Sequence, residues 1–141
     1  MHKQLEQVLE FHQVFSCHTE TAPTVALPSE VPEVRCRLMH EELDEYRDAV
    51  EAGDIVGVAD ALSDLLYVVL GTYISHGFQE IAEKLFDEIH RSNMSKLDAN
   101  GNVLLREDRK VLKSDRWSAP DLQPILTAAA RDTQRSGQDP V

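Results

Sequence analysis

The sequence has few cysteines, few basic side chains and no long uncharged apolar run. Two cysteines, Cys17 and Cys36, are too few for a disulfide scaffold, so we expect a reducing, cytoplasmic setting. Only 14 Lys and Arg stand against 25 acidic residues, for a formal net charge of −11, so a nucleic-acid polymer is not an expected partner. No run of about 18 uncharged apolar residues exists, and the N-terminus lacks the apolar core of a secretory signal. Neither a membrane span nor secretion is expected.

The composition is that of one globular domain. The chain has 141 residues, of which 42% are hydrophobic and 28% charged. We expect a single domain over residues 1–131 and a disordered tail over 132–141. The charge is uneven, because residues 1–70 hold 4 basic and 14 acidic side chains, whereas 91–116 hold 7 basic and 4 acidic. This bias suggests a cation and an anion held together, although two solvated surfaces would give the same count.

Apolar periodicity predicts helices and little else. Spacings of three and four predict helices over 3–17, 29–51, 55–75 and 78–91, and a last short helix from about residue 120. Gly53 is expected to end the second helix and Asp54 to cap the third. A turn at Asn100-Gly101 and apolar residues at 103–105 and 110–112 predict a short hairpin. The expected fold is all-α, a four- to five-helix bundle with a short C-terminal hairpin.

The third predicted helix is apolar nearly all round, which implies burial on every side. One subunit has few other helices with which to cover it. We therefore expect a core shared between subunits, in a homodimer or a dimer-of-dimers tetramer.

Acidic residues fall inside the apolar arc of the second predicted helix. At about 100° per residue, Glu42 lies within that arc, Glu45 at its edge and Glu41 just beyond. A solvated charge run would avoid the arc, so these three residues are candidates for chemistry. A plain helix surface is the alternative.

Two carboxylates interrupt the third predicted helix. Asp60 and Asp64 are the only charged residues between positions 55 and 79, and their spacing of four puts them on one face, with Cβ atoms about 5–6 Å apart. We expect both to be buried, where two like charges repel and need a compensating charge. Either a structural ion pair with a basic residue or a metal ion would serve. Oxygen-only ligands favour Mg²⁺, with Mn²⁺ as a second possibility.

Four segments in order carry a resemblance to a known family. EELDE at 41–45 matches the pattern EExxE, and DALSD follows at 60–64. HRSNMSKLDANG comes next at 90–101, and REDRKVLKSDRW at 106–117. The set resembles the MazG-like, all-α NTP pyrophosphatase superfamily, in its phosphoribosyl-ATP pyrophosphohydrolase-like branch, over roughly residues 11–126.

The resemblance implies a magnesium-dependent hydrolase that cleaves a (deoxy)nucleoside triphosphate between its α- and β-phosphates, in house-cleaning of the nucleotide pool. It implies metal ligation by Glu42, Glu45 and Asp64, with Asp60 as a further ligand. Glu41 and Glu42 would be the catalytic carboxylates, Glu41 as a ligand or by orienting the attacking water. The implied substrate-binding residues are Arg91, Asn93, Lys96, Lys110, Lys113 and Trp117. Among these, Asn93 would recognise a base or ribose, and Trp117 would either stack on a base or close the core.

Two departures from the family pattern keep other interpretations open. Ala61 stands where the second acidic motif usually has a Glu, and Arg109 stands at a glycine position, where it is expected to alter the local hairpin. The alternatives are a phosphoribosyl-ATP pyrophosphohydrolase and a catalytically silent helical module for oligomerisation or regulation.

Overall fold

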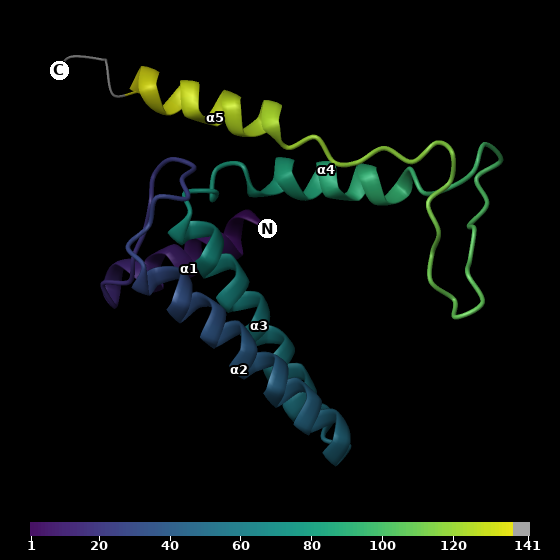
Figure 1. Cartoon of the computed structure of the whole chain (residues 1–141). Helices are drawn as coiled ribbons and strands as arrows, with labels where there is room; N and C mark the ends of the chain where they lie inside the picture. Colours follow the sequence, from purple (N-terminus) through teal and green to yellow (C-terminus); the bar gives the residue numbers. More distant parts are fainter. Residues whose placement is uncertain (137–141) are drawn as a thin grey trace. The chain divides into compact units, whose positions relative to one another are not determined.

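The computed structural model describes residues 1–136 and, within them, an all-helical fold. The helices are α1 (His2–Val14), α2 (Glu30–Ala52), α3 (Ile55–Ser75), α4 (Ala82–Met94) and α5 (Gln123–Ser136) (Figure 1). The predicted all-α class is confirmed. The chain divides into two compact units, Met1–Glu80 and Ile81–Val141, and each is described by itself.

The α2–α3 hairpin is the main feature of the first unit. Gly53 ends α2 in the left-handed conformation, with φ of 69°, and its N–H donates to the Val50 carbonyl at 3.1 Å. The Asp54 carboxylate then caps α3 by accepting the Val56 N–H at 3.0 Å. Both signals act as the sequence predicts. Because only two residues join them, α2 and α3 run antiparallel, side by side (Figure 1).

The core of the first unit lies at the C-terminal half of α3, where α1 packs. Leu5 and Val8 of α1 are buried, as are the α3 residues Leu70 and Ile74. Arg35 of α2 ties the two long helices together, because its guanidinium donates to the Val68 carbonyl at 3.1 Å and to the Thr72 hydroxyl at 3.3 Å.

The N-terminal half of α3 is largely bare in the single chain. Its Ile55, Leu62 and Leu66 are 76%, 48% and 53% exposed, and no α2 residue is fully buried. By length and composition α3 could cross a membrane, and only 22% of its most apolar 18-residue segment is buried. The expected burial on every side is therefore not met within one chain, and a core shared between subunits stays a prediction.

In the second unit, the backbone at Ser118, which follows the predicted C-terminal hairpin, is hydrogen-bonded to α4 and its C-terminal end. Ser92 donates to the Ser118 carbonyl at 2.9 Å, and the Ser118 N–H donates to the Ser95 hydroxyl at 3.0 Å. The predicted hairpin is reduced to one antiparallel bridge between Leu105 and Val111.

Arg109 does not alter that turn as expected. It adopts a φ of 65° itself, and its N–H donates to the Arg106 carbonyl at 2.9 Å. Arg109 thus adopts the left-handed conformation that a glycine would favour, and the turn hydrogen bond forms there.

Three helices have bounds that differ from those predicted. Helix α1 ends at Val14 rather than at position 17, and α4 begins at Ala82, four residues late, and extends to Met94. Helix α5 continues to Ser136, through part of the segment predicted as a disordered tail. Positions 137–141 of that tail lie outside the described residues.

Candidate active site

Glu42 is the centre of an acidic cluster between α2 and α3. The residue is half-buried, and its Oε2 atom is buried without a hydrogen-bond partner among the described residues. Burial raises the pKa of the Glu42 carboxyl, and the negative charges around it raise that pKa further. The contributing neighbours are Glu45, Asp64, Glu41 and Asp60. The structure therefore brings together the five carboxylates that the sequence singles out, and we call them the acidic cluster.

Among the described residues, no basic side chain neutralises the centre of the acidic cluster. Of the α2 arginines, Arg35 is held by α3 backbone and hydroxyl oxygens, and Arg47 pairs with Asp44 at 2.9 Å. Arg37 pairs with Glu41, an exposed member of the cluster, at 3.7 Å. In the described part of the chain, Glu42, Glu45, Asp60 and Asp64 form no ion pair with Lys or Arg. The structural ion pair considered from the sequence is therefore not formed there.

The sequence-based expectation that Asp60 and Asp64 are buried is wrong for the single chain, because both are exposed. The cause is the placement of α1, which packs against the C-terminal half of α3, so that no helix of the first unit covers the carboxylate face. At Glu42, by contrast, one carboxylate oxygen, Oε2, is buried between the two helices.

The acidic cluster is not preassembled around a cation. Within residues 1–132 no three His, Cys, Asp or Glu side chains are arranged to hold a metal ion as they stand. The donor chemistry nevertheless fits a hard divalent cation, because all five groups are carboxylates and one buried oxygen lacks a donor. Binding would require side-chain rotation at the exposed positions.

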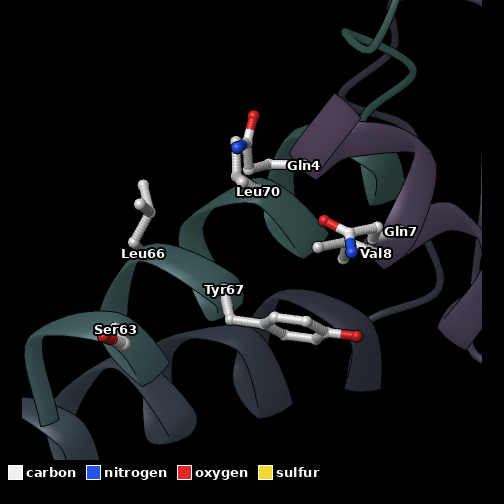
Figure 2. Close-up of a pocket in the computed structure, with 7 residues that line it drawn as sticks. All are labelled: Gln4, Gln7, Val8, Ser63, Leu66, Tyr67 and Leu70. Carbon is white, nitrogen blue, oxygen red and sulfur yellow. The ribbon is translucent and has the colours of Figure 1, made fainter. Parts of the chain in front are cut away.

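A hollow of about 350 Å³ opens beside α1, lined by Gln4, Gln7, Val8, Ser63, Leu66, Tyr67 and Leu70 (Figure 2). None of the acidic cluster lines it. Its Ser63 hydroxyl is engaged with the Ala59 carbonyl at 2.7 Å. The hollow offers apolar and amide contacts and no charged group.

The predicted substrate-binding residues lie in the second unit, and most are engaged there. Lys96 donates to the Asn93 side-chain carbonyl at 2.7 Å, and the Lys113 ammonium sits 3.4 Å from the centre of the Trp117 ring. One face of Trp117 is therefore covered by a cation. Lys110 is exposed. These residues and the acidic cluster belong to different units of the chain. That both bind one substrate is therefore proposed below.

Arg91 has a structural role that the sequence did not reveal. Its guanidinium binds both oxygens of Glu88, at 2.7 Å each, and reaches the Ser118 hydroxyl at 2.7 Å. Glu88 also accepts the Asp121 N–H at 2.7 Å, and the Arg91 and Asp121 bonds lower the pKa of Glu88 to about 2. The Glu-x-x-Arg spacing in the sequence indicates the Glu88–Arg91 pair, but no sequence signal indicates that the pair binds residues 118–121.

Comparison with protein families confirms the resemblance to the MazG-like all-α NTP pyrophosphatase superfamily. The profile of one family in that superfamily, phosphoribosyl-ATP pyrophosphohydrolase, matches residues 8–93. The chain belongs to this family, whose activity is hydrolysis of a phosphoric anhydride in a nucleotide. None of the curated proteins compared with the chain matches it.

The match covers the acidic cluster and ends within α4. It includes all five carboxylates, together with Arg91 and Asn93, whereas Lys96, Lys110, Lys113 and Trp117 lie beyond it. Family membership thus supports a nucleotide pyrophosphohydrolase and leaves the substrate open.

Proposed function

We propose that the protein hydrolyses a nucleoside or deoxynucleoside triphosphate between its α- and β-phosphates, releasing a monophosphate and pyrophosphate in the cytoplasm. The observation that carries the proposal is the buried Glu42 oxygen, which has no hydrogen-bond donor among the described residues and has four carboxylates around it, of which only Glu41 pairs with an arginine there. Such a cluster repels itself until a cation binds, so it suits a site that is completed with its substrate.

Glu42, Glu45, Asp60 and Asp64 would hold Mg²⁺, the hard cation that carboxylate oxygens prefer, and Mn²⁺ would substitute for it. When bound, the ion neutralises phosphate charge and lowers the pKa of a water molecule. Glu41 is exposed and pairs with Arg37 at 3.7 Å. Its carboxylate would accept a proton from the attacking water and would orient that water toward the phosphorus.

Lys96 and Lys113 would bind the remaining phosphate charge. Asn93 positions the Lys96 ammonium, and the Trp117 ring positions that of Lys113, so each cation is partly ordered before substrate arrives. A charge-assisted hydrogen bond contributes about 1.5–3 kcal/mol. Changing either lysine to Ala should therefore lower kcat/KM about tenfold to a hundredfold while leaving the response to Mg²⁺ unchanged.

The test is a panel of NTPs, dNTPs and phosphoribosyl-ATP with Mg²⁺ or Mn²⁺, assayed for both products. Monophosphate with pyrophosphate supports the proposed cleavage, whereas diphosphate with orthophosphate contradicts it. Asp64→Asn should lower activity at least about a hundredfold, and Glu51→Gln, elsewhere on α2, should leave it unchanged.

Phosphoribosyl-ATP is the second candidate substrate, favoured by the family that the chain matches. Hydrolysis of that compound alone in the panel would establish it. A silent helical module, for which Ala61 is the sequence argument, predicts no turnover of any compound and no thermal shift with Mg²⁺.

A further inference from the structure

A set of polar contacts around Gly71 joins α2 to α3. The Arg35 guanidinium of α2 donates to the Val68 carbonyl at 3.1 Å and to the Thr72 hydroxyl at 3.3 Å. It lies over the bare backbone of Gly71, where an added Cβ would come within 2.5 Å of the Arg35 Nη2 atom and within 2.8 Å of Nε2 of the buried His12. We call Arg35 and the three α3 residues beneath it, Val68, Gly71 and Thr72, the Arg35 clamp.

The Arg35 clamp is the polar link between the two long helices. Among the described residues, it supplies every side-chain hydrogen bond that joins α2 to α3. Arg35 is half-buried and forms no ion pair in that part of the chain, so its donors are used on neutral oxygens of α3. These bonds limit how far α2 can slide along α3 or move away from it.

The Arg35 clamp lies two helical turns from the acidic cluster on both helices. Glu42 follows Arg35 by seven residues on α2, and Asp64 precedes Gly71 by seven residues on α3. Seven residues bring a side chain about 10 Å along the helix and back to within about 20° of the same face. Because α2 and α3 are antiparallel, the register in which Arg35 meets Gly71 is also the register in which Glu42 meets Asp64 (Figure 1).

The helices also approach each other closely on the other side of the acidic cluster. An added Cβ at Gly57 would come within 3.1 Å of the Ala49 Cβ. Gly53 and Asp54 then join the two helices through the turn. The carboxylates that face each other across the α2–α3 contact therefore lie between two points where the helices are held close together.

Repulsion within the acidic cluster opposes this arrangement until a cation binds. Three of its carboxylates belong to α2 and two to α3, so their like charges push the two helices apart. The turn holds one end of the hairpin, and the Arg35 clamp holds the other. If the helices were free to separate, the cation would have to bring its ligands together as it binds, and its affinity would fall.

We propose that Arg35 is a positioning residue for the cation site, because its clamp holds the carboxylate faces of α2 and α3 together before the cation binds. This inference rests on the proposed function, in which the acidic cluster binds Mg²⁺. Arg35 acts through geometry and not through its charge, since a positive charge near the cluster repels a cation. Loss of the clamp should therefore weaken cation binding, whereas loss of the charge alone would strengthen it.

The experiment is a titration of metal-free, full-length protein with Mn²⁺, in which electron paramagnetic resonance measures the free ion. Arg35→Met removes the clamp from the α2 side. Gly71→Ala displaces the guanidinium from the α3 side without changing any charge, and alanine is the better helix former. Both variants should raise the Kd for Mn²⁺ about tenfold to a hundredfold, as loss of a residue that orients metal ligands typically does.

Leu5→Ala is the matched control for a general loss of stability. Leu5 is 3% exposed in the core where α1 packs on α3, so its truncation destabilises the same unit without changing a residue of the Arg35 clamp. Its Kd for Mn²⁺ should equal that of wild type.

Thr72→Val keeps the proposal testable if Arg35→Met or Gly71→Ala fails to fold. It removes one acceptor of the Arg35 guanidinium with little change in side-chain volume. Because one hydrogen bond is lost, the Kd for Mn²⁺ should rise about twofold to tenfold.

Failure of the role of Arg35 is distinguishable from failure of the proposed function. If wild type binds Mn²⁺ and the clamp variants bind it as tightly or more tightly, Arg35 does not position the site, and the proposed function stands. A loss of affinity in Leu5→Ala as large as that in Arg35→Met would also overturn the role of Arg35, because general stability would then govern the site. If wild type does not bind Mn²⁺, the proposed function fails and the role of Arg35 fails with it.

Discussion

Replacement of Glu42 by Gln tests the acidic cluster through the stability of the folded protein. The substitution keeps the side-chain shape and replaces one carboxylate oxygen with an amide NH₂ group, which donates hydrogen bonds. In the wild type, the buried Oε2 atom has no donor, and a buried polar group left unsatisfied costs about 1–3 kcal/mol. Glu42→Gln should recover about 1–2 kcal/mol of that cost in metal-free protein, because its amide can donate to neighbouring carboxylates. For a chain of this length the melting temperature should rise by about 3–8 °C.

The same variant should lose its response to the cation. A ligand that binds only the folded state stabilises it by about 2.7 kcal/mol at a hundred times its Kd. Wild type should therefore gain several degrees in Mg²⁺, and Glu42→Gln should gain much less. The order of the two melting temperatures is expected to reverse between EDTA and Mg²⁺, and differential scanning calorimetry in the two buffers would measure it.

Glu51→Gln is the matched control, because Glu51 is exposed on α2 about 180° around the helix from Glu42. It should change the melting temperature little and leave the Mg²⁺ response intact. If Glu42→Gln is destabilised in EDTA, or if it responds to Mg²⁺ as wild type does, the acidic cluster is not a strained cation site and the proposed function loses its support.

Three further predictions concern the scaffold. Burial and, to a lesser degree, the charge of Arg35 lower the pKa of His12 in the folded chain. The unfolded chain therefore binds a proton more readily, and the free energy of unfolding should fall as the pH falls below about 6.5. His12→Asn should flatten that loss in urea titrations between pH 7 and 5. Gly77→Ala should cost about 2–4 kcal/mol in urea denaturation, because φ is +73° and the new Cβ would collide with the Ala22 carbonyl. The control Gly101→Ala, at +78° in open space, should cost only about 1 kcal/mol. Arg109→Gly should stabilise the hairpin turn by less than about 1 kcal/mol, measured as slower amide exchange at Leu112.

The long helices were predictable because their signals are local. Gly53 and Asp54 set the α2–α3 boundary through one left-handed residue and one side-chain cap, both visible in the sequence. The start of α4 was not predictable in this way. Phe78 packs edge-on against Tyr73, and Gln79 donates to the Glu20 carbonyl at 2.8 Å, so tertiary contacts hold residues before Ala82 out of the helix.

The membership of the acidic cluster was predictable, but its burial was not. Spacing on two adjacent helices is enough to place Glu42, Asp60 and Asp64 on facing surfaces. Burial depends on what covers those surfaces, and the apolar character of α3 suggested cover on every side. In the chain itself α1 covers only the C-terminal half of α3, so the two aspartates remain exposed.

The carboxylates of the acidic cluster and two exposed leucines, Leu62 and Leu66, lie on different faces of α3, because both leucines lie about 160° from Asp64. Leu62→Glu should therefore still be stabilised by Mg²⁺ in scanning calorimetry, since its new charge points away from the acidic cluster. If that variant no longer responds to Mg²⁺ although its helix content by circular dichroism is unchanged, binding of the cation depends on what covers the bare half of α3, and the α2–α3 hairpin of one chain is not a sufficient site.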